Sequence, residues 1–78
     1  MPHIIVKLYP GRTEEAKKEA AEKIVKVIEE TLSVDSTYIS VSFEEVQPDR
    51  WATDVYKPEI LDKEDKLYKK PGYRPEGI

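Results

Sequence analysis

The sequence predicts an α+β fold: a β-α-β protomer with a two-stranded parallel sheet and short C-terminal helical segments, completed by oligomerisation. Three observations predict it. Two stretches alternate apolar and polar residues with the two-residue period of a strand, and one amphipathic stretch with helical period lies between them. Turn residues separate the stretches. A helix of this length serves as a crossover, so the two strands should be parallel and their connection right-handed.

The first strand is predicted in the segment HIIVKLY, which starts at His3. Ile4, Val6 and Leu8 point to one face, and the residues between them point to the other. The β-branched content fits a strand. The turn residues of the following PGR segment end it.

The helix is predicted from Thr13 to Leu32, with Thr13 as its N-cap and acidic residues in its first turn. Its apolar stripe consists of Ala16, Ala20, Ile24, Val27 or Ile28, and Leu32. Glutamate–lysine pairs four residues apart mark the solvated face: Glu14–Lys18, Glu19–Lys23 and Glu22–Lys26.

The second strand is predicted in YISVSFEEV, because Ile39, Val41 and Phe43 alternate with polar residues. QPDRW is interpreted as a break. The segment KPEILDKEDKLYKK predicts one or two short helices, with Pro58 separating them or opening the second. KKPGY should end the regular structure, and RPEGI is interpreted as a loose or partner-contacting tail.

The composition indicates one small domain over residues 1–78 that is short of core. Charged residues make up 37% and apolar residues 38% of the chain, and no cysteine is present to form a disulfide. The second face of a two-stranded sheet would also remain uncovered. Both observations predict a homo-oligomer.

The net charge of −3 argues against nucleic acid as a partner, and no apolar run approaches the length that spans a bilayer. Because the chain enters a strand directly, without a signal peptide, we expect a cytoplasmic protein. The sequence contains no glycine-rich phosphate loop, no Ser-His-Asp arrangement and no metal-ligand spacing. The single histidine, His3, cannot form a metal cluster alone and is interpreted as a surface residue. We therefore expect neither a cofactor nor a metal.

The candidates for chemistry are Pro2, Arg12 and Trp51. If Met1 is removed, Pro2 has a free secondary amine; if Met1 stays, that nitrogen is a non-basic amide. Burial and a nearby cation would lower the pKa of the amine and suit it to general-base catalysis. Arg12 has a fork that fits a carboxylate or enolate oxygen. Trp51 would form an apolar wall or pack in a core.

The start MPHI, the GR turn, the QPDRW segment and the near-terminal KKPGY together resemble the 4-oxalocrotonate tautomerase family within the tautomerase superfamily, and its PptA-type dimeric members in particular. The resemblance covers nearly the whole chain. It implies a cofactor-independent keto-enol tautomerase acting on a small enol or dienol carboxylate, such as a 2-hydroxydienoate or phenylenolpyruvate. It also implies that Pro2 is the catalytic base, Arg12 binds the substrate and Trp51 shapes the pocket. A dimer is favoured over a hexamer, because the segment after Trp51 is longer than the short hexameric members need and could block ring closure.

One position departs from the family pattern. Hexameric members carry a second arginine in the second strand, and the matching residue here is Ser40. Arg50 could supply that charge, or Ser40 could hold a water, and substrates with one carboxylate become the better expectation. Two alternatives remain open: hydration or dehalogenation on the same scaffold, with Glu44 or Glu45 activating water, and a non-catalytic dimeric interaction protein.

Overall fold

The computed structural model describes all 78 residues, and they form two compact units, Met1–Glu45 and Val46–Ile78. The first unit holds β1 (His3–Leu8), α1 (Glu14–Leu32), a 3₁₀ turn (Ser36–Tyr38) and β2 (Ser40–Glu45). The second unit holds α2 (Pro48–Trp51), a π-helical segment (Ala52–Leu61) and a 3₁₀ turn (Glu64–Lys66). The expectation of one domain over residues 1–78 stays a prediction.

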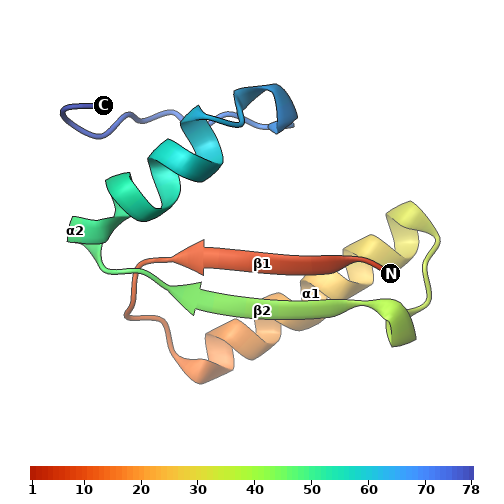
Figure 1. Cartoon of the computed structure of the whole chain (residues 1–78). Helices are drawn as coiled ribbons and strands as arrows, with labels where there is room; N and C mark the ends of the chain where they lie inside the picture. The colour runs from red at the N-terminus through yellow and green to blue at the C-terminus, as the bar shows by residue number, and fades with distance from the viewer. The chain divides into compact units, whose positions relative to one another are not determined.

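The two strands of the first unit run parallel, as Figure 1 shows, and the predicted β-α-β arrangement is confirmed. The register places His3 opposite Ser40 and Leu8 opposite Glu45. Both strands are shorter than predicted. β2 begins only at Ser40, because Tyr38 belongs to the preceding 3₁₀ turn.

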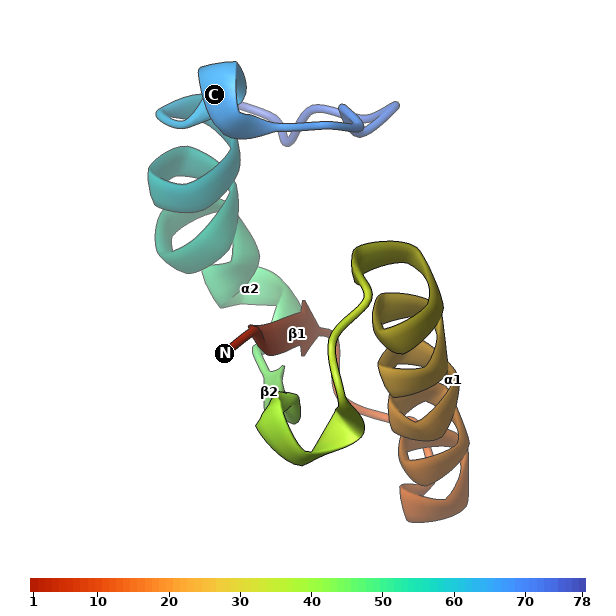
Figure 2. The ribbon, with the colours of Figure 1, turned by 90° about the vertical axis from the view of Figure 1, so that its right-hand side faces the viewer.

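Helix α1 lies along one face of this sheet (Figure 2) and begins where the sequence predicts. Thr13 is the N-cap, and its Oγ1 accepts the N–H of Ala16 at 3.1 Å. Ser33 adopts a left-handed conformation (φ 54°) and ends the helix. Of the two alternatives for the apolar stripe, Ile28 is partly buried whereas Val27 is 55% exposed. Ile28 therefore continues the stripe.

The connection from α1 to β2 is held by two acidic side chains. Glu29 Oε2 accepts the N–H of Ser36 at 3.2 Å, and Asp35 Oδ1 accepts the N–H of Thr37 at 2.8 Å. The hydrogen bond from Thr37 lowers the pKa of Asp35 below its ordinary value. These contacts fix the turn that starts β2.

The second unit corrects two local predictions. QPDRW is not a break: Gln47 is the N-cap, Pro48 occupies the first turn, and the helix runs on to Leu61. Pro58 lies inside this helical segment and neither separates nor opens helices. Because proline has no N–H and its ring clashes with the preceding turn, the helix widens there, and the N–H of Asp62 reaches back five residues to the carbonyl of Lys57 at 3.0 Å.

The buried residues of the chain are Val55 and Tyr56, both in the π-helical segment. The Tyr56 ring lies 5.4 Å from that of Tyr73, and its hydroxyl donates to the Tyr73 carbonyl at 3.3 Å. The C-terminal segment is therefore tied to the helix. None of the helices is both long and apolar enough to cross a membrane.

We expect Thr13→Ala to lower the free energy of unfolding by about 1 kcal/mol, because it removes the side-chain acceptor of the N-cap. The matched control is Thr31→Ala in the last turn of α1. The Thr31 hydroxyl only donates to the Val27 carbonyl at 2.7 Å within the helix, and alanine is the better helix former. Urea unfolding at one fixed protein concentration checks both variants. Equal losses would contradict the capping role.

Candidate active site

Pro2 and Ser40 meet at the N-terminal end of the parallel sheet. Pro2 directly precedes β1 and is partly exposed, and its carbonyl accepts the N–H of Ser40 at 3.2 Å. With Met1 attached, the Pro2 nitrogen is a tertiary amide; without it, the nitrogen is a secondary amine at the mouth of the strand. The parallel pairing thus brings together two of the five residues that the sequence singles out.

His3 is exposed, as predicted, but it has a partner that the sequence does not reveal. Its Nδ1 lies 2.6 Å from Oγ of Ser40, the residue opposite it in the register. The hydroxyl of Ser40 is therefore already hydrogen-bonded within the chain. That Ser40 holds a water stays a prediction, as do the catalytic and binding roles of the other candidate residues.

Arg12 follows the opposite end of β1 from Pro2. Six strand residues, His3–Leu8, separate the two ends, and at a rise of about 3.3 Å per residue this amounts to about 20 Å. Glu44 and Glu45, at the end of β2, lie at the same end as Arg12. A single chain therefore does not bring Arg12 to Pro2.

A groove of about 290 Å³ opens between α1 and the sheet at the Arg12 end. It is lined by Val6, Leu8, Arg12, Ala16, Lys17, Ala20 and Phe43. Apart from two cationic side chains, its walls are apolar. The guanidinium of Arg12 forms no hydrogen bond or ion pair within the chain. An unpaired guanidinium beside an apolar wall suits a carboxylate that carries an apolar group.

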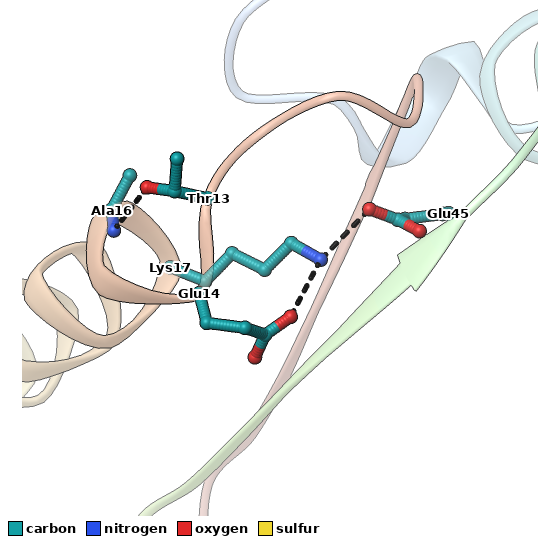
Figure 3. Close-up of polar contacts among 5 residues, drawn as sticks. All are labelled: Thr13, Glu14, Ala16, Lys17 and Glu45. Carbon is teal, nitrogen blue, oxygen red and sulfur yellow. Dashed lines mark hydrogen bonds and ion pairs between the residues drawn. The ribbon is translucent and has the colours of Figure 1, made fainter.

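The other cation of the groove is held by two carboxylates (Figure 3). Lys17 Nζ lies 2.8 Å from Oε2 of Glu45 and 3.5 Å from Oε1 of Glu14, and its side chain is only 15% exposed. The hydrogen bond to Glu45, together with the charges of both carboxylates, raises the pKa of Lys17 above its ordinary value. Lys17 thereby links the first turn of α1 to the end of β2.

Arg50 and Trp51 belong to the second unit, and both have partners there. Arg50 pairs with both carboxylate oxygens of Asp54, with Nε at 3.2 Å and the terminal nitrogen at 2.9 Å. The guanidinium of Arg50 is therefore already paired with a carboxylate. The Trp51 indole N–H donates to the Tyr73 hydroxyl at 2.7 Å. Trp51 thus has a packing role within its own unit, and no sequence signal connects it to a tyrosine 22 positions away.

Comparisons with known proteins give a consistent result. The family model described as "Tautomerase enzyme" matches residues 2–58. A tautomerase PptA from Pectobacterium carotovorum is 46% identical over 74 residues, covering 94% of this chain and 97% of that protein. A probable tautomerase from Xylella fastidiosa is 40% identical over 73 residues, covering 94% of this chain and 89% of that protein.

Solved structures resemble the fold as well. The crystal structure of TomN, a 4-oxalocrotonate tautomerase homologue in the tomaymycin biosynthetic pathway, matches with a TM-score of 0.62 and 32% identity over 64% of this chain and 77% of that one. YwhB, a homologue of 4-oxalocrotonate tautomerase, matches with a TM-score of 0.63 and 33% identity over 69% of this chain and 88% of that one.

We expect Tyr73→Phe to change the fluorescence of Trp51 and to destabilise its surroundings by about 1 kcal/mol, because the partly buried indole N–H loses its acceptor. Trp51 is the only tryptophan, so its emission reports this site directly. Tyr68→Phe is the control, since Tyr68 is fully exposed. An unchanged emission spectrum in Tyr73→Phe would show that the contact is not maintained in solution.

Proposed function

This chain belongs to the tautomerase family, and from that premise we propose that Pro2, freed by loss of Met1, is the general base of its keto-enol reaction. The enzyme is a tautomerase, a class of isomerase, as the family and its named relatives show. The observation that carries the proposal is the position of Pro2. It starts the family match and stands at the mouth of β1, where it is partly covered.

The proposed reaction transfers one proton. The neutral amine of Pro2 takes the hydroxyl proton of an enol, the C–O bond becomes a carbonyl, and the prolinium returns the proton to the carbon at the other end of the double bond. Substrate and product are isomers, so no cofactor is consumed. The amine must be neutral at the start, and it benefits from a site that water does not fill.

Arg12 is proposed to bind the substrate carboxylate and to steady the enolate. Because Arg12 and Pro2 follow opposite ends of β1, we propose that each site combines Pro2 of one copy with Arg12 of another. The homo-oligomer is then required for catalysis as well as for stability. A dimer, our preferred assembly, would contain two such sites, and a hexamer stays the alternative.

Ser40 narrows the proposed substrate class. The position where hexameric relatives are expected to carry a second arginine holds a hydroxyl bonded to His3, and Arg50 is paired with Asp54. Neither Ser40 nor Arg50 therefore offers an unpaired second guanidinium to a substrate carboxylate. We therefore propose enol or dienol substrates with one carboxylate, of which phenylenolpyruvate is the test compound.

Trp51 is proposed to form the apolar wall of the site, in addition to its bond with Tyr73. The family match runs from residue 2 to residue 58 and so spans both compact units, which supports treating the chain as one functional domain. A cytoplasmic location stays a prediction.

Two observations weigh against hydration or dehalogenation. Glu44 pairs with Lys7 at 3.7 Å and Glu45 with Lys17 at 2.8 Å, so neither is free to activate water. A non-catalytic interaction protein would be favoured by a retained Met1. The intact mass of the natively expressed protein decides this point.

We expect Pro2→Ala to reduce mainly kcat, because the base becomes a freer primary amine, and Arg12→Ala to raise KM about ten-fold or more, because a charge-assisted contact with the carboxylate is lost. Arg12→Lys keeps the charge without the fork and should fall between the parent and Arg12→Ala. Steady-state kinetics on phenylenolpyruvate, with Met1 shown absent by mass, measure all three. Parent-like turnover by both alanine variants would overturn the proposed roles.

We further expect activity at substrate concentrations well below KM, where both variants are impaired, to rise above either control when Pro2→Ala and Arg12→Ala chains are unfolded, mixed in equal amounts and refolded together. In a two-fold symmetric dimer with shared sites, half of the dimers are mixed and each has one intact site, so about a quarter of parental activity should return. Each variant refolded alone is the control. Activity no higher than these controls would place both residues in a site formed by one chain.

A further inference from the structure

Two carboxylates stand close to the groove that holds Arg12. Glu14 is only two residues further along the chain, in the first turn of α1. Glu45 is the register partner of Leu8, and Leu8 lines the same groove as Arg12. A guanidinium binds carboxylates bidentately and strongly, so either glutamate is a natural competitor for the fork of Arg12.

Arg12 nevertheless stays unpaired, and the two glutamates pair with Lys17 instead. Its ammonium lies within 3.5 Å of Glu14 and within 2.8 Å of Glu45, and so occupies both competitors. The Lys17 side chain is 15% exposed, whereas Lys23, which pairs with Glu19 on the same helix, is 75% exposed. The Lys17–Glu45 pair is therefore less open to water than the Lys23–Glu19 pair and its charges are screened less, whereas the Glu14 side chain is 82% exposed.

We propose that Lys17 is a positioning residue that keeps Arg12 available to the substrate by occupying Glu14 and Glu45. This inference rests on the proposed function, in which Arg12 binds the substrate carboxylate. Lys17 lines the same groove as Arg12, but in this role it does not act on the reacting atoms. It acts through the charge balance of the groove.

The electrostatic reason is the cost of leaving a carboxylate without a partner in a partly covered site. Without Lys17, Glu45 loses its 2.8 Å partner and, because its side chain is only 41% exposed, gains by pairing with another nearby cation. Lys18 lines the neighbouring groove together with Glu14 and can serve that residue. Leu8, the register partner of Glu45, lines the same groove as Arg12, whose guanidinium is unpaired. In the absence of Lys17, Arg12 would therefore pair with Glu45. The substrate would then have to displace an internal carboxylate.

The test separates this role from a purely structural ion pair. We expect Lys17→Met to raise KM for phenylenolpyruvate about ten-fold, comparable to Arg12→Ala, while kcat changes less than two-fold. Lys17→Met combined with Glu45→Gln should bring KM back to within about three-fold of the parent, because the competing charge is gone. A structural ion pair predicts no such recovery, since the double variant lacks the pair as well.

Two further variants complete the test. Glu45→Gln alone removes the 2.8 Å contact of Lys17 but leaves no unpaired carboxylate to compete for Arg12. The KM of this variant should therefore stay near that of the parent. Lys23→Met, the matched control on α1, should also leave KM unchanged. Thermal melting at one protein concentration verifies that each variant is folded.

The outcomes are distinguishable. If Arg12→Ala leaves KM unchanged, the proposed carboxylate role of Arg12 fails, and the role of Lys17 fails with it. If Arg12→Ala raises KM but Lys17→Met does not, or if Glu45→Gln fails to restore it, only the Lys17 inference is overturned. A large KM increase in Glu45→Gln alone would also overturn it, because the contact itself would then matter rather than the freed charge.

Discussion

The parallel pairing of β1 with β2 is the constraint on which the rest of the first unit depends. A parallel pair requires a crossover, and α1 supplies it and covers one sheet face. The same pairing places both strand starts together, so Pro2 meets Ser40, and both strand ends together, so Glu45 lies beside Leu8. In an antiparallel hairpin, the start of one strand would instead lie beside the end of the other. The separation of Pro2 from Arg12 has a different origin: the two residues follow opposite ends of the same strand, β1.

The chain is short of buried surface, and this links its stability to its assembly. The buried residues, Val55 and Tyr56, both lie in the second unit, and in the first unit Ile5 is 48% exposed on a strand. Apolar surface that a chain leaves exposed gives additional stability when another copy covers it. The predicted homo-oligomer and the proposed shared site therefore both need a second chain. Under this proposal, disrupting the assembly would impair stability and catalysis together.

Charge arrangement distinguishes the two arginines considered for the site. Arg50 is held by Asp54 one helical turn away, a pairing that the local sequence itself favours. Arg12 has acidic neighbours as well, yet they are bound by Lys17. The sequence alone suggests Glu14–Lys18 as the ion pair of this turn, whereas the structure pairs Glu14 with Lys17. The difference arises because Glu45, from a distant strand, draws Lys17 toward the sheet.

The sequence by itself determined the element types of the first unit, the cap at Thr13, the parallel crossover and the family, because these follow from local periodicity, capping chemistry and motif order. Only the tertiary structure decided the His3–Ser40 register, the Lys17 bridge and the Trp51–Tyr73 bond, since each joins residues far apart in the chain. It also decided that Pro58 remains inside a helix. A proline weakens a helix locally, but here the turn widens around it, and the packing of Val55 and Tyr56 on the same segment favours continuing the helix.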